Sequence, residues 1–307
     1  MSKPIVSLVV CTYNRSRMLV SALYSLINQT VDKNTYEIVI VDNGSIDETK
    51  EVVSTFKKKY ADIKIKYVYE KRQGLSYARN TGLGKTESEY IAYIDDDAKA
   101  SKNWLYEALK VIVSKKPDIF GGPIYPYYLI KKPEWFKDEY EIRMTSKRSR
   151  FLRRGEYISG SNIFSKKELL LKLGGFNTKI GMKGEKLSYH EETDLIIKAW
   201  ENNPSLKVYY SLPLKVEHLV REEKMCISFY FKSCFFSGKE YTKINRKCNK
   251  KVKSLILILI SLIRIIKCFV KGIFRNKVIY KHYKNYLREN VGAYVFCLGK
   301  SIGSILR

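Results

Sequence analysis

The first hundred residues alternate between short apolar runs and segments whose apolar side chains recur at helical spacing. The runs that predict strands are PIVSLVVCTYN, which ends in a turn, YEIVIVD, IKIKYVYE and YIAYI. Ser16 is the expected N-cap of the first helix, and Ser45 to Glu48 has the spacing of a capping box that opens the second helix. Strands separated by helices in this way predict an α/β fold with a doubly wound, mostly parallel sheet, covered by helices on both faces.

The pattern between residues 105 and 225 is less regular. Two segments that contain glycines, 119–128 and 157–165, predict strands or loops. A short helix is expected to end at Gly174 and Gly175, and an amphipathic helix is predicted over residues 191–203. The apolar face of that amphipathic helix consists of Leu195, Ile196, Ala199 and Trp200.

The C-terminal region differs in kind from the rest. Residues 254–263, SLILILISLI, are uninterrupted apolar, and Arg264, Lys267 and Lys271 follow within the next turns. Residues 239–307 contain 17 Lys or Arg and two Glu, a net charge of +15. These features predict a helix that lies in the interface of an anionic membrane. Two alternatives remain, a single spanning helix over residues 252–274 and a buried core helix.

The composition of the whole chain limits its class. In 307 residues there are 57 Lys or Arg against 31 Asp or Glu, a net charge of +26, with 45% hydrophobic residues. This hydrophobic fraction excludes a disordered polycation, and the charge predicts attraction to nucleic acid, acidic lipid or phosphorylated substrates. The six cysteines, at 11, 226, 234, 248, 268 and 297, show no framework spacing, so we expect free thiols in a reducing compartment.

Polar residues follow three of the predicted strands. Thr12, Asn14 and Arg15 follow the first strand, Asp42 follows the second, and the run of Asp95 to Asp97 follows the fourth. Parallel strands bring their carboxyl ends to one edge of a sheet, where open α/β sheets bind ligands. Each group also has an ordinary alternative, because Asp42 can serve the turn DNGS and three aspartates can form a solvated turn.

Three adjacent carboxylates repel one another, and a divalent cation relieves that cost, so we expect Mg²⁺ or Mn²⁺ here. The motifs of other nucleotide-binding proteins are missing from the sequence. There is no GxxxxGK[ST] and no GxGxxG after the first strand, which disfavours P-loop enzymes and dinucleotide oxidoreductases. Without a glycine-rich loop at the first turn, phosphates would be held by a metal and by side chains such as Arg79.

Several ordered blocks resemble family 2 glycosyltransferases with the GT-A fold. The blocks are VSLVVCTYNR, IVIVDNGSIDET, GLSYARNTGL, YIAYIDDDA, SGSNIFSKKELLLKLGGFN and HEETDL, which together cover roughly residues 5–220. The resemblance implies that Thr12, Asn14 and Arg15 line the nucleotide pocket and that Asp42 faces the base. It also implies that Arg79 approaches the diphosphate or the aspartates.

In the same family pattern, the three aspartates correspond to the DxD element. The resemblance implies that Asp97 coordinates the metal, that Asp95 holds the ribose or supports the metal site, and that Asp96 belongs to the donor site. VEHLV is similar to the segment with the family's late histidine, which makes His218 a candidate metal or phosphate contact. A satisfied loop histidine is the alternative for His218.

HEETDL resembles the acidic pair of the family, in which the second acid is more commonly Asp. Aligned on Asp194, Glu192 takes the position of the catalytic base and Glu191 precedes it. The alternative is that both are ordinary acids in the first turn of a helix, where carboxylates are favoured. Trp135, Tyr125, Tyr127 and Tyr128 are expected either to stack on sugar rings of the acceptor or to be plain core or surface aromatics.

The resemblance therefore implies an inverting transferase that moves a sugar from a nucleotide-diphosphate donor to an acceptor hydroxyl. Two other classes remain as alternatives, a sugar-phosphate nucleotidyltransferase and a basic nucleic-acid-binding protein, although no nucleic-acid-binding motif is present and no nucleic acid is expected as a partner.

The expected domains are a glycosyltransferase domain over residues 1–225, with nucleotide-binding (1–104) and acceptor-binding (105–225) halves, and a helical membrane-associated region over 226–307. The cationic, apolar tail suggests a saccharide or lipid-linked acceptor at the cytoplasmic face of an anionic membrane, in glycolipid or polysaccharide synthesis.

Overall fold

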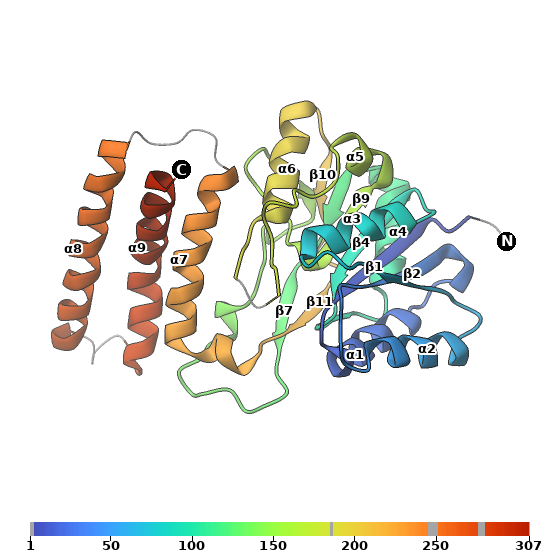
Figure 1. Cartoon of the computed structure of the whole chain (residues 1–307), viewed down its shortest axis with the longest axis horizontal. Helices are drawn as coiled ribbons and strands as arrows, with labels where there is room; N and C mark the ends of the chain where they lie inside the picture. The colour runs from blue at the N-terminus through green and yellow to red at the C-terminus, as the bar shows by residue number, and fades with distance from the viewer. Residues whose placement is uncertain (1–2, 185–186, 245–250, 276–279, 307) are drawn as a thin grey trace. The chain divides into compact units, whose positions relative to one another are not determined.

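The computed structural model describes residues 3–184, 187–244, 251–275 and 280–306, and its contacts divide the chain into two compact units (Figure 1). The first unit contains Met1–Tyr127, Ile142–Gly184 and Glu191–Leu219, and the second contains Tyr128–Glu141, Glu185–His190 and Val220–Arg307. Five cysteines are free thiols, as expected, and Cys248 lies outside the described residues.

An eight-stranded sheet forms the centre of the first unit, in the order β3-β2-β1-β4-β9-β6-β10-β8. Strands β3, β2, β1 and β4 run parallel to one another, whereas β9 is antiparallel to both β4 and β6. The predicted α/β class with a mostly parallel sheet is thereby confirmed. The strands are β1 (Val6–Thr12), β2 (Tyr36–Asp42), β3 (Lys64–Tyr69), β4 (Tyr90–Asp95), β6 (Ile119–Gly121), β8 (Arg150–Phe151), β9 (Ile163–Lys166) and β10 (Val208–Tyr210).

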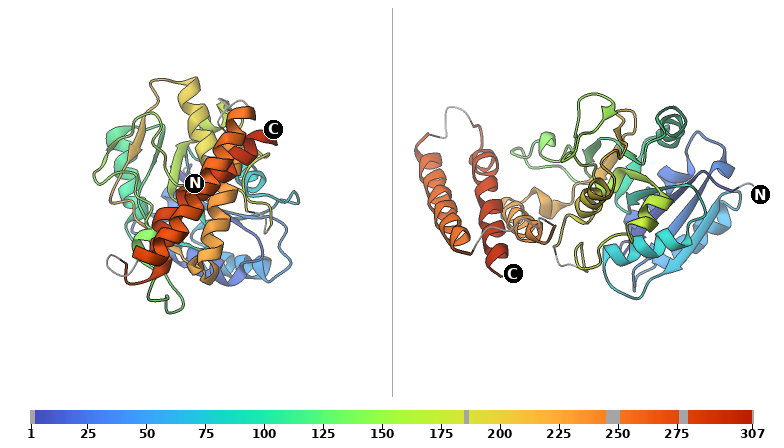
Figure 2. Two further views of the ribbon diagram at one scale, coloured as in Figure 1. Left: turned by 90° about the vertical axis from the view of Figure 1, so that its left-hand side faces the viewer. Right: turned by 90° about the horizontal axis from the view of Figure 1, so that it is seen from above.

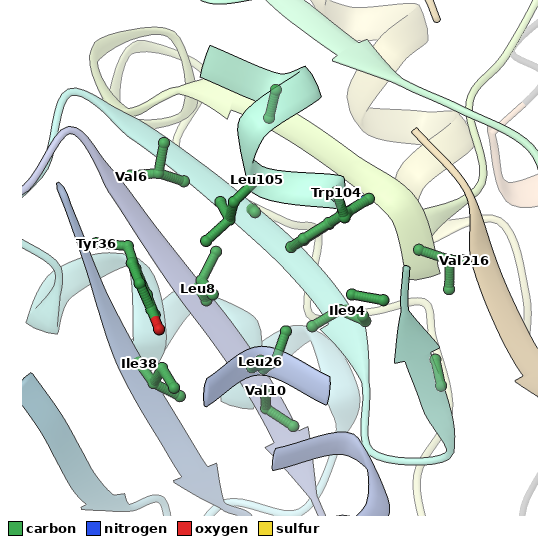
Figure 3. Packing of buried hydrophobic residues seen from close by; sticks show 14 of the residues in the cluster. Val6, Leu8, Val10, Leu26, Tyr36, Ile38, Ile94, Trp104, Leu105 and Val216 are labelled. Carbon is green, nitrogen blue, oxygen red and sulfur yellow. The ribbon is translucent and has the colours of Figure 1, made fainter. Parts of the chain in front are cut away.

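Helices cover both faces of this sheet, because the strand side chains alternate between two apolar clusters. Val6, Leu8 and Val10 of β1 enter one cluster together with α1, α2 and α4, as Figure 3 shows beside Leu26 and Trp104, while Val9 enters the other cluster with α3, α5 and α6. The helices are α1 (Ser16–Ile27), α2 (Thr49–Lys59), α3 (Leu75–Lys85), α4 (Trp104–Lys115), α5 (Lys167–Lys172) and α6 (Glu191–Asn202).

Two predicted helix N-caps are wrong, by one residue at Ser16 and by three at Ser45, for one shared reason. The N-cap of α1 is Arg15, and Ser16 is the first helical residue, whose amide donates to Asp47 at 2.9 Å. The second helix begins at Thr49, so Ser45 to Glu48 forms no capping box. The hydroxyl of Ser45 instead accepts a hydrogen bond from the backbone amide of Asn14. Both serines are therefore used to join the loops after β1 and β2.

A second, three-stranded sheet has the order β5-β11-β7, with β5 at Ala98–Ala100, β11 at Val216–Leu219 and β7 at Ile124–Tyr127. Strand β5 follows directly on the aspartate run, and His218 of β11 is registered opposite Ala98. The amide of Leu219 also donates to the carbonyl of Asp97. This pairing holds β11 against the turn that carries the three aspartates.

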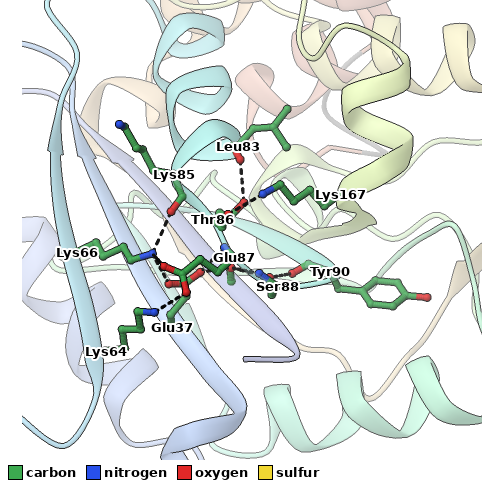
Figure 4. Close-up of polar contacts among 11 residues, drawn as sticks. Glu37, Lys64, Lys66, Leu83, Lys85, Thr86, Glu87, Ser88, Tyr90 and Lys167 are labelled. Carbon is green, nitrogen blue, oxygen red and sulfur yellow. Dashed lines mark hydrogen bonds and ion pairs between the residues drawn. The ribbon is translucent and has the colours of Figure 1, made fainter. Parts of the chain in front are cut away.

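At the amino ends of the central strands, a buried carboxylate is neutralised by lysine (Figure 4). Glu37 of β2 is fully buried, accepts a hydrogen bond from Ser7 at 2.6 Å and lies 2.8 Å from the ammonium of Lys66. Lys66 also pairs with Glu87. Because a buried charge is tolerated only when it is paired, this network serves the packing of the sheet.

The second unit contains α7 (Ile227–Ile244), α8 (Lys251–Arg275) and α9 (Tyr283–Ile305), which confirms the predicted helical C-terminal region (Figure 2). Helices α7 and α9 approach each other closely at glycines. A Cβ on Gly238 would meet the carbonyl oxygen of Phe296 at 2.0 Å, and one on Gly299 would meet that of Phe235 at 2.0 Å. Any larger residue there would force the two helices apart.

Two expectations about the second unit are tested by burial, and a third is tested by the length and apolarity of its helices. Trp135 is 5% exposed in a cluster with Phe136, Val220 and Met225, so the prediction that it stacks on sugar rings is wrong. Helix α8 exposes nine large apolar side chains, so the core-helix alternative is also wrong. No helix in the described ranges, α8 included, has both the length and the apolarity needed to cross a membrane.

Candidate active site

The polar residues predicted at the strand ends do come to one edge of the sheet. Thr12 at the end of β1 is registered opposite Asp42 at the end of β2, and Cys11 is opposite Asp95 at the end of β4. Thr12 and Asp42 are each 2% exposed. The parallel register therefore brings together residues that are 30 and 84 positions apart in the sequence.

Asp42 is one of the residues that line an open pocket of about 330 Å³. One carboxylate oxygen accepts a hydrogen bond from the amide of Ser45 at 2.8 Å, and the other accepts one from the hydroxyl of Tyr67 at 2.6 Å. Asp42 therefore closes the turn and also lines the pocket. The pocket is lined by Asp42, Ser45, Ile46, Asp47, Lys50, Glu51, Tyr67 and Tyr69.

Asn14 and Arg15 shape the rim of this edge from the loop after β1. Asn14 adopts a left-handed backbone with φ of 51°, and its side-chain oxygen accepts a hydrogen bond from the amide of Ile46 at 2.8 Å. Arg15 points to the aspartates instead, with Nη1 3.0 Å from Asp96 and 3.5 Å from Asp97. The loop thus joins the pocket beside Asp42 to the aspartate turn.

Asp95, Asp97 and His218 converge on one point. Nε2 of His218 lies 3.4 Å from a carboxylate oxygen of Asp95 and 3.2 Å from one of Asp97. One ligand atom from each of these residues lies within 4.8 Å of the others, and Asp97 and His218 are buried. The structure therefore brings together the three residues that were expected to hold a metal.

The hydrogen bonding of His218 supports a ligand role for its inner nitrogen. Nδ1 lies 3.1 Å from the carbonyl oxygen of Leu219, an acceptor only, so Nδ1 carries a hydrogen and donates it. Nε2 then faces two carboxylates, with a lone pair when the ring is neutral. A metal ion between Nε2 and the carboxylates fits this donor set, because ligating histidines usually donate their other N–H to a carbonyl or carboxylate.

Asp96 is the aspartate that does not join this cluster. It is 2% exposed, and burial raises the pKa of its carboxyl to about 6, against the lowering effect of Arg15 and with a further raising effect of Asp97. Asp95 behaves in the opposite way. Although burial raises the pKa of Asp95, the hydrogen bond with His218 and the charge of Arg79 hold it well below its usual range.

Arg79 of α3 is a buried cation that links the aspartate turn to the start of α6. Its Nη1 lies 3.0 Å from Glu191, and its Nη2 lies 3.6 Å from Asp95. The guanidinium lies over the ring of Phe176, 5.1 Å from its centre. Gly160 leaves the necessary space, because a Cβ there would meet Nη2 at 2.9 Å.

Glu191 and Glu192 begin α6, where the N-terminal end of the helix favours carboxylates. Glu191 is 6% exposed, and burial together with the charge of Glu192 raises the pKa of its carboxyl to about 7, against the lowering effect of Arg79. Glu192 is half-buried. The more accessible of the two acids is therefore Glu192, and the ion-paired one is Glu191.

Sequence reasoning missed Tyr67 and Tyr69, which line the pocket beside Asp42. Their alternation with Val68 on β3 resembles that of any half-buried strand. The missing signal was register, since Tyr69 lies opposite Asp42 across the parallel pair. It also missed the contact of Tyr127, whose hydroxyl lies 3.3 Å from the carbonyl oxygen of Asp97.

Two comparisons of this sequence with known proteins agree with each other. Residues 7–173 match the family model described as "Glycosyl transferase family 2". The glucosyl-dolichyl phosphate glucuronosyltransferase of Haloferax volcanii is 30% identical over 247 residues, which cover 76% of this chain and 75% of that protein.

Two solved structures share the fold at low identity. The mannosyltransferase PcManGT of Pyrobaculum calidifontis, in complex with GDP-Man and Mn²⁺, has a TM-score of 0.67 and 16% identity, over 100% of this chain and 88% of its own. The S. aureus protein TarS in complex with UDP-GlcNAc has a TM-score of 0.58 and 20% identity, over 81% of this chain and 69% of its own.

Proposed function

This chain belongs to glycosyl transferase family 2 and is a glycosyltransferase, and we propose that it transfers a sugar with inversion from a nucleotide-diphosphate donor to an acceptor hydroxyl. The observation that carries this proposal is the convergence of Asp95, Asp97 and His218 beside the ion pair of Arg79 and Glu191. A cluster of metal-ligating groups next to a buried guanidinium and an acidic helix start suits the departure of a diphosphate and the deprotonation of a hydroxyl.

The donor occupies the edge of the sheet formed by residues 1–104. The nucleoside sits in the pocket beside Asp42, where the Tyr67 hydroxyl lies next to the base-facing carboxylate. Thr12 is registered opposite Asp42, and Asn14 is hydrogen-bonded to Ser45 and Ile46 of the pocket lining, whereas Arg15 reaches the aspartates. This assignment is supported by the pocket volume of about 330 Å³, which lies in the range of small-molecule sites. Residues 105–225 then provide the acceptor half.

A divalent cation, Mg²⁺ or Mn²⁺, fits between Asp95, Asp97 and His218, because these residues supply two carboxylate oxygens and one imidazole nitrogen. When bound, such an ion neutralises negative charge on the diphosphate leaving group. Arg15 and Arg79 add fixed positive charge around the same aspartates. Asp96 holds Arg15 in place on the donor side.

Glu192 is the general base of the proposed reaction. It takes the proton of the acceptor hydroxyl as that oxygen bonds to the anomeric carbon, and the bond from this carbon to the diphosphate breaks on the opposite side. The nucleoside diphosphate leaves with the electron pair. Glu191 does not remove the proton in this scheme, because its carboxylate is occupied by Arg79 at 3.0 Å; it positions the first turn of α6.

The proposed acceptor is a lipid-linked or growing surface saccharide at the cytoplasmic face of a membrane, to which the chain attaches peripherally in glycolipid or polysaccharide synthesis. Two observations support this choice. The Haloferax volcanii relative is named for a dolichyl phosphate-linked substrate. The region from residue 239 onward carries a net charge of +15, which anionic lipid attracts.

The test is a panel of nucleotide sugars, each assayed for Mn²⁺-dependent binding and slow hydrolysis by the purified full chain. We expect one donor class to be hydrolysed and Asp97→Ala to abolish that hydrolysis, while Asp62→Ala, an exposed aspartate, leaves it unchanged. Undiminished hydrolysis by Asp97→Ala would refute the metal assignment. Release of pyrophosphate from a nucleoside triphosphate would instead favour a nucleotidyltransferase.

A further inference from the structure

Helix α8 has the reverse of the polarity expected for a helix on a soluble protein. The residues it buries include Ser254 and Ser261, which are 0% and 4% exposed. Ile265 and Cys268 of α8 pack against a small apolar cluster on α9. This cluster consists of Tyr286, Leu287 and Val291, and Gly272 of α8 lies against Tyr286. Because a water-exposed helix usually turns its apolar stripe inward, this arrangement requires an explanation.

The outward side of α8 is a continuous apolar face. Residues at positions 255, 259, 262, 266 and 270 repeat at intervals of three and four, which places them on one side of a helix. Leu255 and Leu259 are 60% exposed and Ile266 is 61% exposed. The apolar face is defined by nine exposed residues, Leu255, Ile256, Leu259, Ile260, Leu262, Ile263, Ile266, Phe269 and Val270.

Cationic residues border this apolar face along one edge. The exposed basic residues of this edge are Lys253, Arg264, Lys267 and Lys271. The last three follow Lys253 by 11, 14 and 18 residues, which correspond to about three, four and five helical turns. They therefore form a single row, the cationic row. Helix α8 contains no Asp or Glu that could neutralise it.

We propose that the apolar face and cationic row of α8 form a docking surface for an anionic lipid bilayer, with the helix lying parallel to the membrane plane. The apolar side chains enter the boundary between headgroups and acyl chains, and the cations contact lipid phosphates. This inference deepens the proposed function and rests on it only for the identity of the acceptor. It assigns the membrane contact to one surface of one helix.

The dimensions of α8 suit this orientation. The apolar face runs from residue 255 to residue 270, about 24 Å at 1.5 Å per residue, so it can lie flat over several lipid headgroups. Lysine and arginine carry their charge on long apolar stems. The cationic row can therefore reach phosphates at the surface while neighbouring leucines and isoleucines remain deeper.

Charge distinguishes a lipid surface from a second copy of this chain. If two copies paired through their apolar faces, each would bring a cationic row to the contact without an acidic residue on either α8 to meet it. Like charges at an interface disfavour association. An anionic bilayer satisfies both features, since it offers hydrocarbon to the apolar face and phosphate to the cationic row.

The proposal is tested by sedimenting the full chain with vesicles of phosphatidylcholine alone or mixed with phosphatidylglycerol. We expect binding to the anionic vesicles that weakens as salt is raised. The double variant Leu259→Glu with Ile263→Glu should reduce the partition coefficient at least about tenfold, because it places two anions in the lipid boundary. Lys267→Gln with Lys271→Gln should reduce it on the order of tenfold.

Matched control variants test whether the effect on vesicle binding is specific to α8. They make the same kinds of substitution at exposed positions on other helices. Val113→Glu with Leu171→Glu changes two exposed apolar residues on α4 and α5 and adds the same charge. Lys57→Gln with Lys58→Gln removes two exposed charges from α2. Both controls should bind anionic vesicles within about twofold of the wild type. In addition, a tryptophan substituted at Leu259, but not one at Val113, should be quenched by brominated lipid.

Unchanged vesicle binding by Leu259→Glu with Ile263→Glu would overturn the proposal. A wild-type dimer that this variant converts to monomer, without vesicle binding by either, would overturn it in favour of a second copy. Hydrolysis of the nucleotide sugar by water needs no membrane, so the variant should retain it. Absence of hydrolysis in a wild type that binds vesicles would refute the proposed function and leave the docking surface standing.

Discussion

The guanidinium of Arg79 lies 3.0 Å from the carboxylate of Glu191, and both side chains are almost completely buried. The same guanidinium lies 3.6 Å from Asp95. One cation therefore holds two acids that are 96 residues apart in the sequence, one at the end of β4 and one at the start of α6. This relationship positions Glu192, the proposed base, relative to the aspartate turn.

Replacing Arg79 should cost much more stability than replacing an exposed arginine. Arg79→Met leaves Glu191 and Asp95 buried without their cation, and we expect a loss of about 3–5 kcal/mol in the free energy of unfolding at pH 8. The matched control is Arg148→Met, which changes an exposed arginine and should cost less than about 1 kcal/mol. Urea denaturation of both variants measures the difference.

A double variant tests whether the cost arises from the buried charge. Adding Glu191→Gln to Arg79→Met removes one uncompensated carboxylate, so part of the lost stability should return. If the losses of Arg79→Met and Glu191→Gln were simply additive, the ion pair would contribute no coupling. Packing of Arg79 on Phe176 would then account for the whole effect.

The raised pKa of Glu191 predicts a pH dependence of stability. In the folded chain the carboxyl keeps its proton up to about pH 7, whereas in the unfolded chain it ionises near its ordinary value of 4.5. The unfolded state therefore binds fewer protons between these values, so stability falls as pH rises through this window and levels off above pH 7. The fall attributable to Glu191 is roughly 3 kcal/mol at most.

Denaturation of the wild type and Glu191→Gln at pH 5, 6, 7 and 8 checks this sign. The difference in unfolding free energy between the two proteins should change across the window, with the wild type losing stability relative to the variant. Two parallel profiles would contradict the prediction. A wild type that gained stability with rising pH relative to the variant would show that the pairing with Arg79 outweighs the burial of Glu191.

The sequence predicted those site residues whose signal is local. The aspartate run and Asp42 each follow an apolar strand, and the strand-end rule alone placed them at one edge. Tyr67 could not be found in this way, because its role depends on the register of β3 against β2. Register is set by the packing of whole strands and leaves no mark on the two tyrosines themselves.

The same reasoning explains which parts of the fold escaped prediction. Two features were not predicted. One is the helix Trp104–Lys115, which follows the aspartate turn and β5. The other is the segment Tyr128–Glu141, which belongs to the second unit although it interrupts the first unit in sequence. Arg288 of α9 holds that segment through Glu141 at 3.1 Å. A contact across 147 residues is not encoded in any local pattern, and neither is the packing of Trp135 against Val220 and Met225.

His218 should determine which metal the site prefers. Imidazole binds the transition metal Mn²⁺ better than Mg²⁺, which prefers oxygen ligands. His218→Gln should therefore weaken Mn²⁺ binding more than Mg²⁺ binding, measured by calorimetric titration of each ion with the nucleoside diphosphate present. His282→Gln, which changes a histidine of the second unit, is the control and should change neither. Equal losses for both ions would indicate that His218 only supports the aspartates.

The bond from Tyr67 to Asp42 should set the affinity for the donor nucleotide. The hydroxyl donates to the carboxylate at 2.6 Å and so competes with any base N–H for the same oxygen. Asp42→Asn should raise KM for the preferred nucleotide sugar by about tenfold, with a smaller effect on kcat, because the contact lies away from the anomeric carbon. Tyr67→Phe should change KM but leave kcat unaltered.

Steady-state kinetics with donors that differ only in their base provides the check on this prediction. If Asp42 faces the base, Asp42→Asn should narrow the ratio of kcat/KM between the preferred and a disfavoured base, since discrimination depends on a hydrogen-bond partner in the pocket. Lys58→Gln, an exposed residue of α2 that does not line the pocket, serves as the control and should leave the ratio within about twofold. An unchanged ratio in Asp42→Asn would limit Asp42 to its turn with Ser45.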